Sequence, residues 1–345
     1  MTPAPPPSPI DVTVVLPVRN EGGHIDLVLG DLLAQTFPAE RTELLVVDGR
    51  SDDDTRARVA AAAARDRRVR LLDNPRRLSS SARAIGVREA RGRYVAFVDG
   101  HCRVPRTTLL ADMVELFERT GAACLGRPQP LVASATGAVA RAVSVARSSP
   151  FGHSTKSEIY GDREGPASPV SHGAMYRREV FEQVGSFDEG FDACEDVELN
   201  WRVERAGLPC VTSGRLAVAY EPRRTLRGLF RQMHRYGLGR ARLHRKHPAA
   251  FTVESLVPAA FVLGVPALPL APLLPRPLGL AVAAAWALYL VLALGFAAAA
   301  AARAGRLALL PLVVLAFVTI HLGLGSGYLR GWLTPKPSPV AEAAS

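Results

Sequence analysis

Short apolar runs and longer stretches with helical spacing alternate along the first hundred residues. Four of the runs are nearly continuous in Val, Leu, Ala and Phe, which is typical of strands buried on both faces of a parallel sheet. These runs are Val12–Leu16, Glu43–Asp48, Val69–Leu72 and Tyr94–Asp99. Apolar residues at helical spacing predict helices at His24–Gln35, Thr55–Arg65 and Ser79–Ala90. The alternation predicts an α/β fold with a doubly wound, mostly parallel sheet.

Beyond residue 250 the pattern changes to long apolar runs. Leu278–Ala302 and Leu307–Leu329 contain no acidic or basic residue except His321, and about 20 apolar residues suffice to cross the hydrocarbon core of a bilayer. Ser255–Leu274 is also apolar, but four prolines interrupt it. Proline kinks helices, so this segment is either a bent span or a re-entrant hairpin. The sequence therefore predicts two or three transmembrane helices.

The charges follow the same division. The net charge is +10, yet no acidic residue lies between Glu221 and Glu254, where nine basic residues gather. Apolar residues recur at helical spacing within Pro222–Pro248, which predicts an amphipathic basic helix on an anionic membrane surface. A nucleic-acid-binding surface is an alternative interpretation of such a helix, but the neighbouring apolar segments favour the membrane surface. We expect a membrane partner and no nucleic acid.

Basic residues also predict the orientation in the membrane. The basic helix precedes the first apolar segment, and Arg303 and Arg306 separate the last two. The positive-inside rule assigns both groups to the cytoplasmic side. We therefore expect a multi-pass protein of the cytoplasmic membrane whose α/β domain faces the cytoplasm.

These boundaries divide the chain into five parts. They are a disordered leader (1–10), the α/β domain (11–221), the basic interface segment (222–250), the membrane domain (251–333) and a tail (334–345). The leader lacks the charged and apolar regions of a signal peptide. The four cysteines form no C-x-x-C pair, so we expect neither a disulfide framework nor a zinc site.

Polar residues gather where the predicted strands end. The strands are followed by "LPVRNE", "VVDGRSDDDT", "NPRRLSSSARAIG" and "VDGH". Helix capping explains Asp48 or Asp53 taken singly, but four polar strand ends share one edge of a parallel sheet, where ligands of such folds bind. There is no G-x-G-x-x-G after the first strand and no P-loop, which disfavours a dinucleotide or P-loop site. An aspartate such as Asp99 suits a divalent cation that bridges two phosphates, so we expect a nucleoside diphosphate with a group attached.

Several motifs, taken together, resemble a known family. They are "VVLPVRNE", "VVDGRSDDDT", "VAFVDGH", "HGAMYRREVFEQVGSFDEGF", "CEDVELNWRVERAG" and "RQMHRYGLGR". In this order they resemble the family 2 glycosyltransferases, which have a GT-A fold, and most of all the membrane-attached bacterial enzymes that build succinoglycan-type exopolysaccharide. The resemblance implies a metal-dependent hexosyltransferase that uses a nucleotide-sugar, with Mg²⁺ or Mn²⁺ as cofactor and a lipid-linked acceptor.

The resemblance also implies residue roles. Donor binding is assigned to Pro17, Glu21, Asp48, Asp53, Arg83, Asp99, Gln232, Arg235 and Tyr236. Asp99 and His101 match the metal-binding pair, while His172 and Gly173 match the acceptor side, although a loop hydrogen bond is nearly as good an interpretation of His172. Asp196 matches the general base, with Glu195 beside it.

Three departures from the family pattern change the expectations. Gly49 and Arg50 replace an aspartate and a glycine that follow Asp48 in the family. His101 replaces the second metal-binding aspartate, and an imidazole suits Mn²⁺ better than Mg²⁺. Tyr236 replaces the tryptophan of processive synthases, so we expect a single transfer rather than polymerisation.

The acidic stretch "FDACEDVELNWRVERAG" fits this chemistry. Inverting transfer needs a base that faces the acceptor hydroxyl, opposite the leaving diphosphate, and we assign this role to Asp196. Acidity at a helix start is an equally good interpretation of Glu198. The expected acceptor is a polyprenyl-diphosphate-linked saccharide. The alternatives are a polyprenyl-phosphate glycosyltransferase and a catalytically silent nucleotide-binding scaffold on the membrane.

Overall fold

The computed structural model describes residues 10–131, 137–154 and 157–334. The predicted leader and tail therefore lie outside the described residues, apart from Ile10 and Thr334. The chain forms two compact units, which are Met1–Pro130 with Ser157–Tyr220 and Leu131–Lys156 with Glu221–Ser345.

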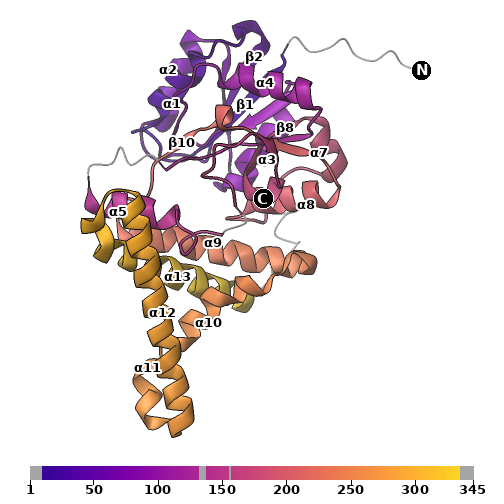
Figure 1. Cartoon of the computed structure of the whole chain (residues 1–345). Coiled ribbons are helices and arrows are strands. Elements are labelled where there is room, and N and C mark those ends of the chain that lie inside the picture. The colour runs from indigo at the N-terminus through magenta and orange to yellow at the C-terminus, as the bar shows by residue number, and fades with distance from the viewer. Residues whose placement is uncertain (1–9, 132–136, 155–156, 335–345) are drawn as a thin grey trace. The chain divides into compact units, whose positions relative to one another are not determined.

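The first unit is built on an eight-stranded sheet with the order β3-β2-β1-β4-β8-β6-β9-β7 (Figure 1). Its strands are β1 (Val12–Val18), β2 (Thr42–Asp48), β3 (Val69–Asp73), β4 (Tyr94–Phe97), β6 (Cys124–Gly126), β7 (Gly165–Pro166), β8 (Gly173–Arg177) and β9 (Cys210–Thr212). Strands β1 to β4 are parallel, β8 is antiparallel to β4 and to β6, and β6 is parallel to β9. A small second sheet pairs β5 (Cys102–Arg103) with β10 (Ala219–Tyr220). The predicted mostly parallel α/β sheet is confirmed.

Helices connect these strands. They are α1 (Ile25–Leu33), α2 (Thr55–Arg65), α3 (Ser79–Glu89), α4 (Leu109–Thr120), α6 (Pro169–His172), α7 (Glu179–Val184) and α8 (Glu195–Arg205), with 3₁₀ turns at Ala39–Arg41 and Gly214–Leu216. The first three helices agree with the sequence prediction to within two residues at each end. Strand β4 ends two residues earlier than predicted, so Asp99 lies in the loop that follows it.

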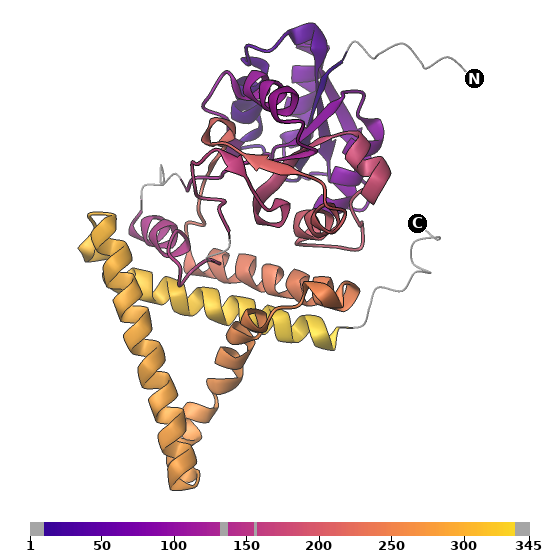
Figure 2. The ribbon, with the colours of Figure 1, turned by 45° about the vertical axis from the view of Figure 1, so that its right-hand side comes forward.

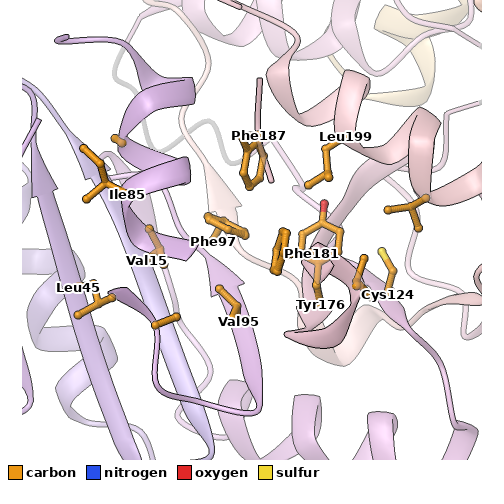
Figure 3. Close-up of a cluster of buried hydrophobic side chains, with 14 of the residues drawn as sticks. Val15, Leu45, Ile85, Val95, Phe97, Cys124, Tyr176, Phe181, Phe187 and Leu199 are labelled. Carbon is orange, nitrogen blue, oxygen red and sulfur yellow. The ribbon is translucent and has the colours of Figure 1, made fainter. Parts of the chain in front are cut away.

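Large side chains fill the core of the first unit. Figure 3 shows Phe97 at the centre of one cluster, with Phe181, Phe187 and Tyr176 around it. The Phe97 and Phe187 rings meet edge to face with their centroids 5.0 Å apart, a favoured aromatic geometry. This cluster joins the sheet to α3 and α8, which both carry residues of the predicted site.

The second unit is helical. Its helices are α5 (Ala138–Arg147), α9 (Leu226–Lys246), α10 (Val257–Gly264), α11 (Ala267–Leu270), α12 (Arg276–Arg303) and α13 (Leu310–Leu333), with 3₁₀ turns at Pro248–Ala250, Val253–Leu256, Ala271–Leu273 and Leu307–Leu309. The predicted basic helix is α9, which begins at the cap residue Thr225, whose hydroxyl accepts the Gly228 N–H at 3.0 Å.

Helix α5 is the one element that the sequence assigned to a different part of the chain. It was expected in the α/β domain, but it belongs to the second unit. The cause is its apolar face, because Val143 and Ala146 are buried in a cluster with Leu229 of α9 and Phe317 of α13.

Helices α9 and α13 lie side by side along their lengths (Figures 1 and 2). Glycines at every fourth position of α13 permit this close approach. A Cβ on Gly323 would come within 2.6 Å of Met233, and one on Gly327 would collide with the backbone carbonyl of His234. Small residues at such spacing are typical of closely packed helices in membrane proteins.

Helices α12 and α13 meet the length and apolarity requirements of a membrane span. The proline-rich segment does so only as a bent pair, in which Val253–Gly264 and Ala267–Leu273 meet at 52°. By length and composition the described residues of this unit therefore contain two candidate spans, or three if the bent pair counts as one.

Candidate active site

The loops after β1 and β2 are tied together by their polar side chains. Asp53 accepts hydrogen bonds from the Gly22 and Thr55 N–H groups, both at 3.0 Å, and from the Thr55 hydroxyl at 2.5 Å. The Thr55 hydroxyl is the main cause that lowers the pKa of Asp53. Asn20 adopts a left-handed backbone with φ 57° and its side-chain oxygen accepts the Asp52 N–H at 3.0 Å. Asp53 therefore stabilises the conformation of the two loops, and its contact with a nucleotide-sugar donor remains a prediction.

Asp48 lies at the carboxyl end of β2 and is completely buried. Its carboxylate accepts the Ser51 hydroxyl at 2.5 Å and the Arg56 guanidinium at 3.2 Å. Pro17 lies on the neighbouring strand β1, in register with Val47. Both residues are thus at the sheet edge where the sequence predicted the nucleotide.

One buried arginine connects the two ends of the predicted site. Arg83 of α3 is 9% exposed. Its Nη2 donates to Asp99 at 2.7 Å, and its Nε lies 3.3 Å from a Glu195 carboxylate oxygen. The guanidinium also lies over the Phe97 ring, 5.4 Å from its centroid. Arg83 therefore fixes the loop after β4 and the start of α8 relative to each other.

The electrostatics of this cluster differ between its two carboxylates. Burial raises the pKa of Asp99, but the positive charges of Arg83, His101 and Arg127 outweigh it and lower the pKa below its usual value. Burial dominates at Glu195 and raises its pKa despite the charge of Arg83. Asp99 thus stays ionised, while the proton affinity of Glu195 is increased.

Asp196 points differently from its neighbour. Glu195 is buried against Arg83, whereas Asp196 is exposed on the first turn of α8. Successive helical residues differ by about 100° in direction, so the two carboxylates diverge. Cys194, just before them, has a left-handed backbone with φ 63°, and such strain in a non-glycine residue concentrates at functional sites. The arrangement offers one exposed carboxylate, the one that the sequence assigned as the base.

Glu198 has a structural environment. It is completely buried and forms an ion pair with Arg202 at 2.8 Å. Arg202 donates in turn to the carbonyls of Val184, Gly185 and Ser186. The pair therefore fixes the turn before the "FDEGF" segment. Glu198 thus has a structural role in addition to its favourable position at the start of a helix.

His101 lies at the position of the predicted metal ligand. Its Nδ1 is 3.1 Å from a Glu21 carboxylate oxygen, and its ring packs edge to face on Tyr220 with centroids 5.5 Å apart. Among the described residues, no three His, Cys, Asp or Glu side chains form a group that could hold a metal ion. The described part of the chain therefore offers at most two ligands here, Asp99 and His101 through Nε2, which fits an ion that takes its other ligands from phosphates and water.

His172 and Gly173 lie in a tightly packed region between α6 and β8. His172 is buried, and its two ring nitrogens contact the hydroxyls of Ser171 at 2.7 Å and Thr212 at 2.8 Å. Burial lowers the pKa of His172 to about 4. The Gly173 carbonyl accepts the amide of Asn200 at 2.9 Å. These contacts agree with the loop hydrogen bond weighed for His172, and the acceptor-side role of both residues stays a prediction.

The last three predicted donor residues lie on α9 in the second unit. Gln232 is buried, accepts from Arg147 at 3.5 Å and donates to the Tyr236 hydroxyl at 3.3 Å. Tyr236 is 37% exposed and Arg235 is exposed. Their role in donor binding remains a prediction.

Sequence reasoning missed Arg127. This residue follows β6 and is 3% exposed, and neither Nε nor Nη1 has a hydrogen-bond partner. Strand β6 is only three residues long and carries no turn motif, so nothing in the sequence marked the strand end where Arg127 lies.

Comparisons with known proteins bear on the family of the chain. The family model described as "Glycosyl transferase family 2" matches residues 13–185, and the model "Glycosyl transferase family group 2" matches residues 153–319. The succinoglycan biosynthesis protein ExoA of Rhizobium meliloti is 32% identical over 249 residues, which cover 72% of this chain and 74% of that protein. Glycosyltransferase AglE of Haloferax volcanii is 28% identical over 66% of this chain and 72% of its own.

A solved structure shows the same fold. The mannosyltransferase PcManGT from Pyrobaculum calidifontis, in complex with GDP-Man and Mn²⁺, aligns with a TM-score of 0.57 and 19% identity over 92% of this chain and 89% of its own. The likeness shows a shared GT-A fold. Because the family 2 model matches half of the sequence and a 32% identical relative matches most of it, the chain belongs to the family 2 glycosyltransferases.

Proposed function

We propose that the protein is an inverting hexosyltransferase of cell-surface polysaccharide synthesis. It moves one sugar from a nucleotide-sugar, which we take to be a UDP-sugar, to a polyprenyl-diphosphate-linked saccharide at the membrane. The α/β unit faces the cytoplasm, where nucleotide-sugars are available.

One observation carries the proposal: Arg83 contacts both Asp99 and Glu195, and the residue after Glu195 is the exposed Asp196. Direct displacement at a sugar carbon requires two separate functions, stabilisation of the leaving diphosphate and removal of the acceptor proton. Asp99, at the sheet edge, belongs to the diphosphate end. Asp196, at the start of α8, belongs to the acceptor end.

The chain's own groups then have defined tasks. The acceptor hydroxyl gives its proton to the Asp196 carboxylate as its oxygen bonds the anomeric carbon, and the bond to the diphosphate breaks on the opposite face. A divalent cation, when bound, neutralises charge on the leaving diphosphate. Asp99 and His101 would hold it, and the lowered pKa of Asp99 keeps this carboxylate in the ionised form that metals require.

The membrane unit supports a lipid-linked acceptor. Exposed arginines on α9 provide positive charge on an apolar unit, which suits an acceptor that carries phosphates and remains in the bilayer. A polyprenyl-phosphate acceptor would use the same features, so the two acceptor classes must be separated by experiment. The exposed carboxylate and the ionised Asp99 both favour an enzyme over a silent scaffold.

The test is transfer by the purified, detergent-solubilised full chain. UDP- and GDP-sugars are screened with Mg²⁺ or Mn²⁺, with polyprenyl phosphate or with a lipid extract that contains diphosphate-linked saccharides. We expect metal-dependent release of the nucleoside diphosphate that rises with the saccharide-containing extract, and a product with inverted anomeric configuration by NMR. No nucleotide binding and no release with any donor would move the assignment to the scaffold.

The Asp196→Asn variant tests the base. We expect kcat to fall by about 10²–10⁴-fold, the usual range for loss of a general base, with no change in unfolding temperature because Asp196 is exposed. The control is Asp192→Asn on the preceding loop, which should keep kcat within about threefold. Near-normal turnover of Asp196→Asn would remove Asp196 from the mechanism.

A further inference from the structure

Arg127 is a buried charge whose compensation is incomplete within the chain. Its side chain is 3% exposed, and its Nε and Nη1 have no hydrogen-bond partner. Burial of a charge without partners is costly, and buried donors are nearly always satisfied. Such a residue is therefore a candidate for contact with a ligand.

Its position in the sheet indicates which ligand. Strand β6 is antiparallel to β8, and β8 is antiparallel to β4, so β6 and β4 run in the same direction. Arg127 after β6 and Asp99 after β4 therefore lie at the same edge of the sheet.

We propose that Arg127 binds a phosphate group of the nucleotide-sugar diphosphate, an assignment that rests on the proposed function. A guanidinium is always charged and its N–H groups match phosphate oxygens. In the free protein the two nitrogens lack partners, and in the complex they donate to the diphosphate. The same charge then stabilises the leaving group as negative charge develops on it.

The test uses Arg127→Met, which removes the charge and keeps an apolar stem. Binding of UDP, GDP and uridine is measured by calorimetry with Mn²⁺ present. We expect the diphosphate that binds the wild type to bind the variant about tenfold to a hundredfold more weakly, the usual effect of losing a charged hydrogen bond, while uridine affinity is unchanged. The unfolding temperature of the free variant should rise, because an uncompensated buried charge is gone.

The control is Arg93→Met, an exposed arginine that precedes β4 at the opposite sheet edge and pairs with Glu118. It should bind the nucleotides as the wild type does. Equal diphosphate affinity in Arg127→Met would overturn the assignment, and so would a variant that loses affinity for farnesyl diphosphate in micelles but keeps affinity for UDP and GDP. Absence of nucleotide binding by the wild type would instead overturn the proposed function itself.

A second observation concerns α13, which is long and apolar enough to span a membrane. It packs along α9 from the cluster that contains Leu229 and Phe317 to the C-terminal turn, where Arg245 donates to the Gly331 carbonyl at 2.9 Å. A buried hydrogen bond joins His244 to Tyr328 at 2.9 Å within this contact. The two helices therefore occupy the same depth in the membrane.

A position of α9 beside α13 inside a bilayer would be energetically unfavourable. Arg231, Arg235 and Arg240 lie in the middle part of α9 and are exposed, and charged side chains at the centre of a membrane are strongly disfavoured. Helix α12 has the opposite character, because its large exposed apolar side chains are Leu, Val and Phe and its two arginines, Arg276 and Arg303, are its first and last residues. Its 28 residues, at about 1.5 Å each, reach roughly 42 Å, more than the hydrocarbon thickness.

We infer that α10, α11 and α12 form a hairpin that crosses the membrane twice, while α9 and α13 lie together at the cytoplasmic interface. The chain leaves the cytoplasmic side along α10 and α11 and comes back to it along α12. Figure 2 shows that α10 and α12 approach each other at the end that is far from the α9–α13 pair. Trp286 of α12 donates to the Gly264 carbonyl of α10 at 3.2 Å. Arg303 and Arg306 then lie on the same side as α9, as the positive-inside rule requires.

The test is cysteine labelling in intact bacterial cells with a membrane-impermeant maleimide. Two variants of the full chain are compared, Leu273→Cys at the hairpin tip and Leu333→Cys at the end of α13, which are 82% and 85% exposed. The wild type, whose four cysteines are buried, is the blank. We expect labelling of Leu273→Cys in intact cells and of Leu333→Cys only after lysis. Labelling of Leu333→Cys in intact cells, or of Leu273→Cys only after lysis, would overturn the topology.

Discussion

The two units of the chain place their large side chains in opposite ways. In the first unit the fully buried residues include Tyr94, Phe97 and Tyr176, and charges at the surface face water. In α12 of the second unit the buried residues are glycine and alanine, while Leu280 and Leu288 are about 60% exposed. The first pattern is typical of a protein folded in water, and the second of helices whose outer face contacts lipid.

Polar groups differ between the units in a related way. In the first unit a buried charge such as Arg83 connects two carboxylates of the candidate active site. In the second unit the polar groups of the apolar helices bond to each other, as Tyr289 bonds His321 at 3.0 Å and His321 contacts the Phe151 carbonyl at 2.9 Å. Buried polar groups thus connect residues of the candidate active site in one unit and form internal hydrogen bonds in the other.

The largest expected contrast comes from removing one large side chain from each unit. Phe97→Ala should lower the free energy of unfolding by about 3–5 kcal/mol, the usual cost of a cavity left by phenylalanine in a core. Leu288→Ala should change it by less than about 0.5 kcal/mol in detergent, since exposed positions tolerate substitution. Thermal unfolding in the same detergent measures both. Equal losses would mean that Leu288 contacts protein rather than lipid.

A smaller contrast tests the glycine contact between α9 and α13. Gly327→Leu should destabilise the second unit by about 1–3 kcal/mol, the usual cost of overpacking, because its side chain would collide with the His234 backbone. The matched control is Gly295→Leu in α12, where no atom lies within 4 Å of an added Cβ. Unfolding temperatures in detergent provide the measurement, and an unaffected Gly327→Leu protein would contradict the close packing.

A third expected effect, similar in size to that of Gly327→Leu, is a pH dependence from His172. Burial lowers the pKa of His172 to about 4 in the folded protein. As the pH falls below about 6.5, the imidazole is therefore protonated in the unfolded chain but stays neutral in the folded chain. The contribution of neutral His172 to stability is present above pH 6.5 and is lost as the pH falls toward 4. The stability advantage of the wild type over His172→Gln should therefore shrink by about 1–3 kcal/mol across this range, at about 1.4 kcal/mol per pKa unit.

The same variant separates the two interpretations of His172. If its ring only bonds Ser171 and Thr212, His172→Gln should keep the acceptor KM of the wild type. A raised KM with unchanged pH dependence of stability would restore the acceptor-side role.

Local pattern was sufficient for the strands that are long and buried. Residues 12–18 and 42–48 are almost wholly buried on both faces, so their sequence is mostly apolar and the strands can be recognised. Strands β6 and β9 are three residues long and pair with segments distant in the chain. Their sequence carries too little periodicity to mark them, and Arg127 was missed for the same reason.

The sequence predicted those residues of the candidate site that stand out by their residue type at the end of a strand or the start of a helix. Asp48, Asp99 and Asp196 lie in the loops or at the strand and helix ends where the sequence predicted them. The sequence could not distinguish Glu195, which is buried on Arg83, from Asp196, which is exposed, because burial depends on which helix packs against α8.

The sequence by itself determined the division into an α/β part, a basic helix and an apolar part, as well as the membership of a glycosyltransferase family. These properties follow from composition, period and motif, which are local. Tertiary structure alone decided that α5 joins the second unit, that Arg83 connects two carboxylates, and that α13 lies along an arginine-rich helix. Each of these depends on contacts between residues far apart in the chain, since burial and pairing are properties of the packed molecule and not of any one segment.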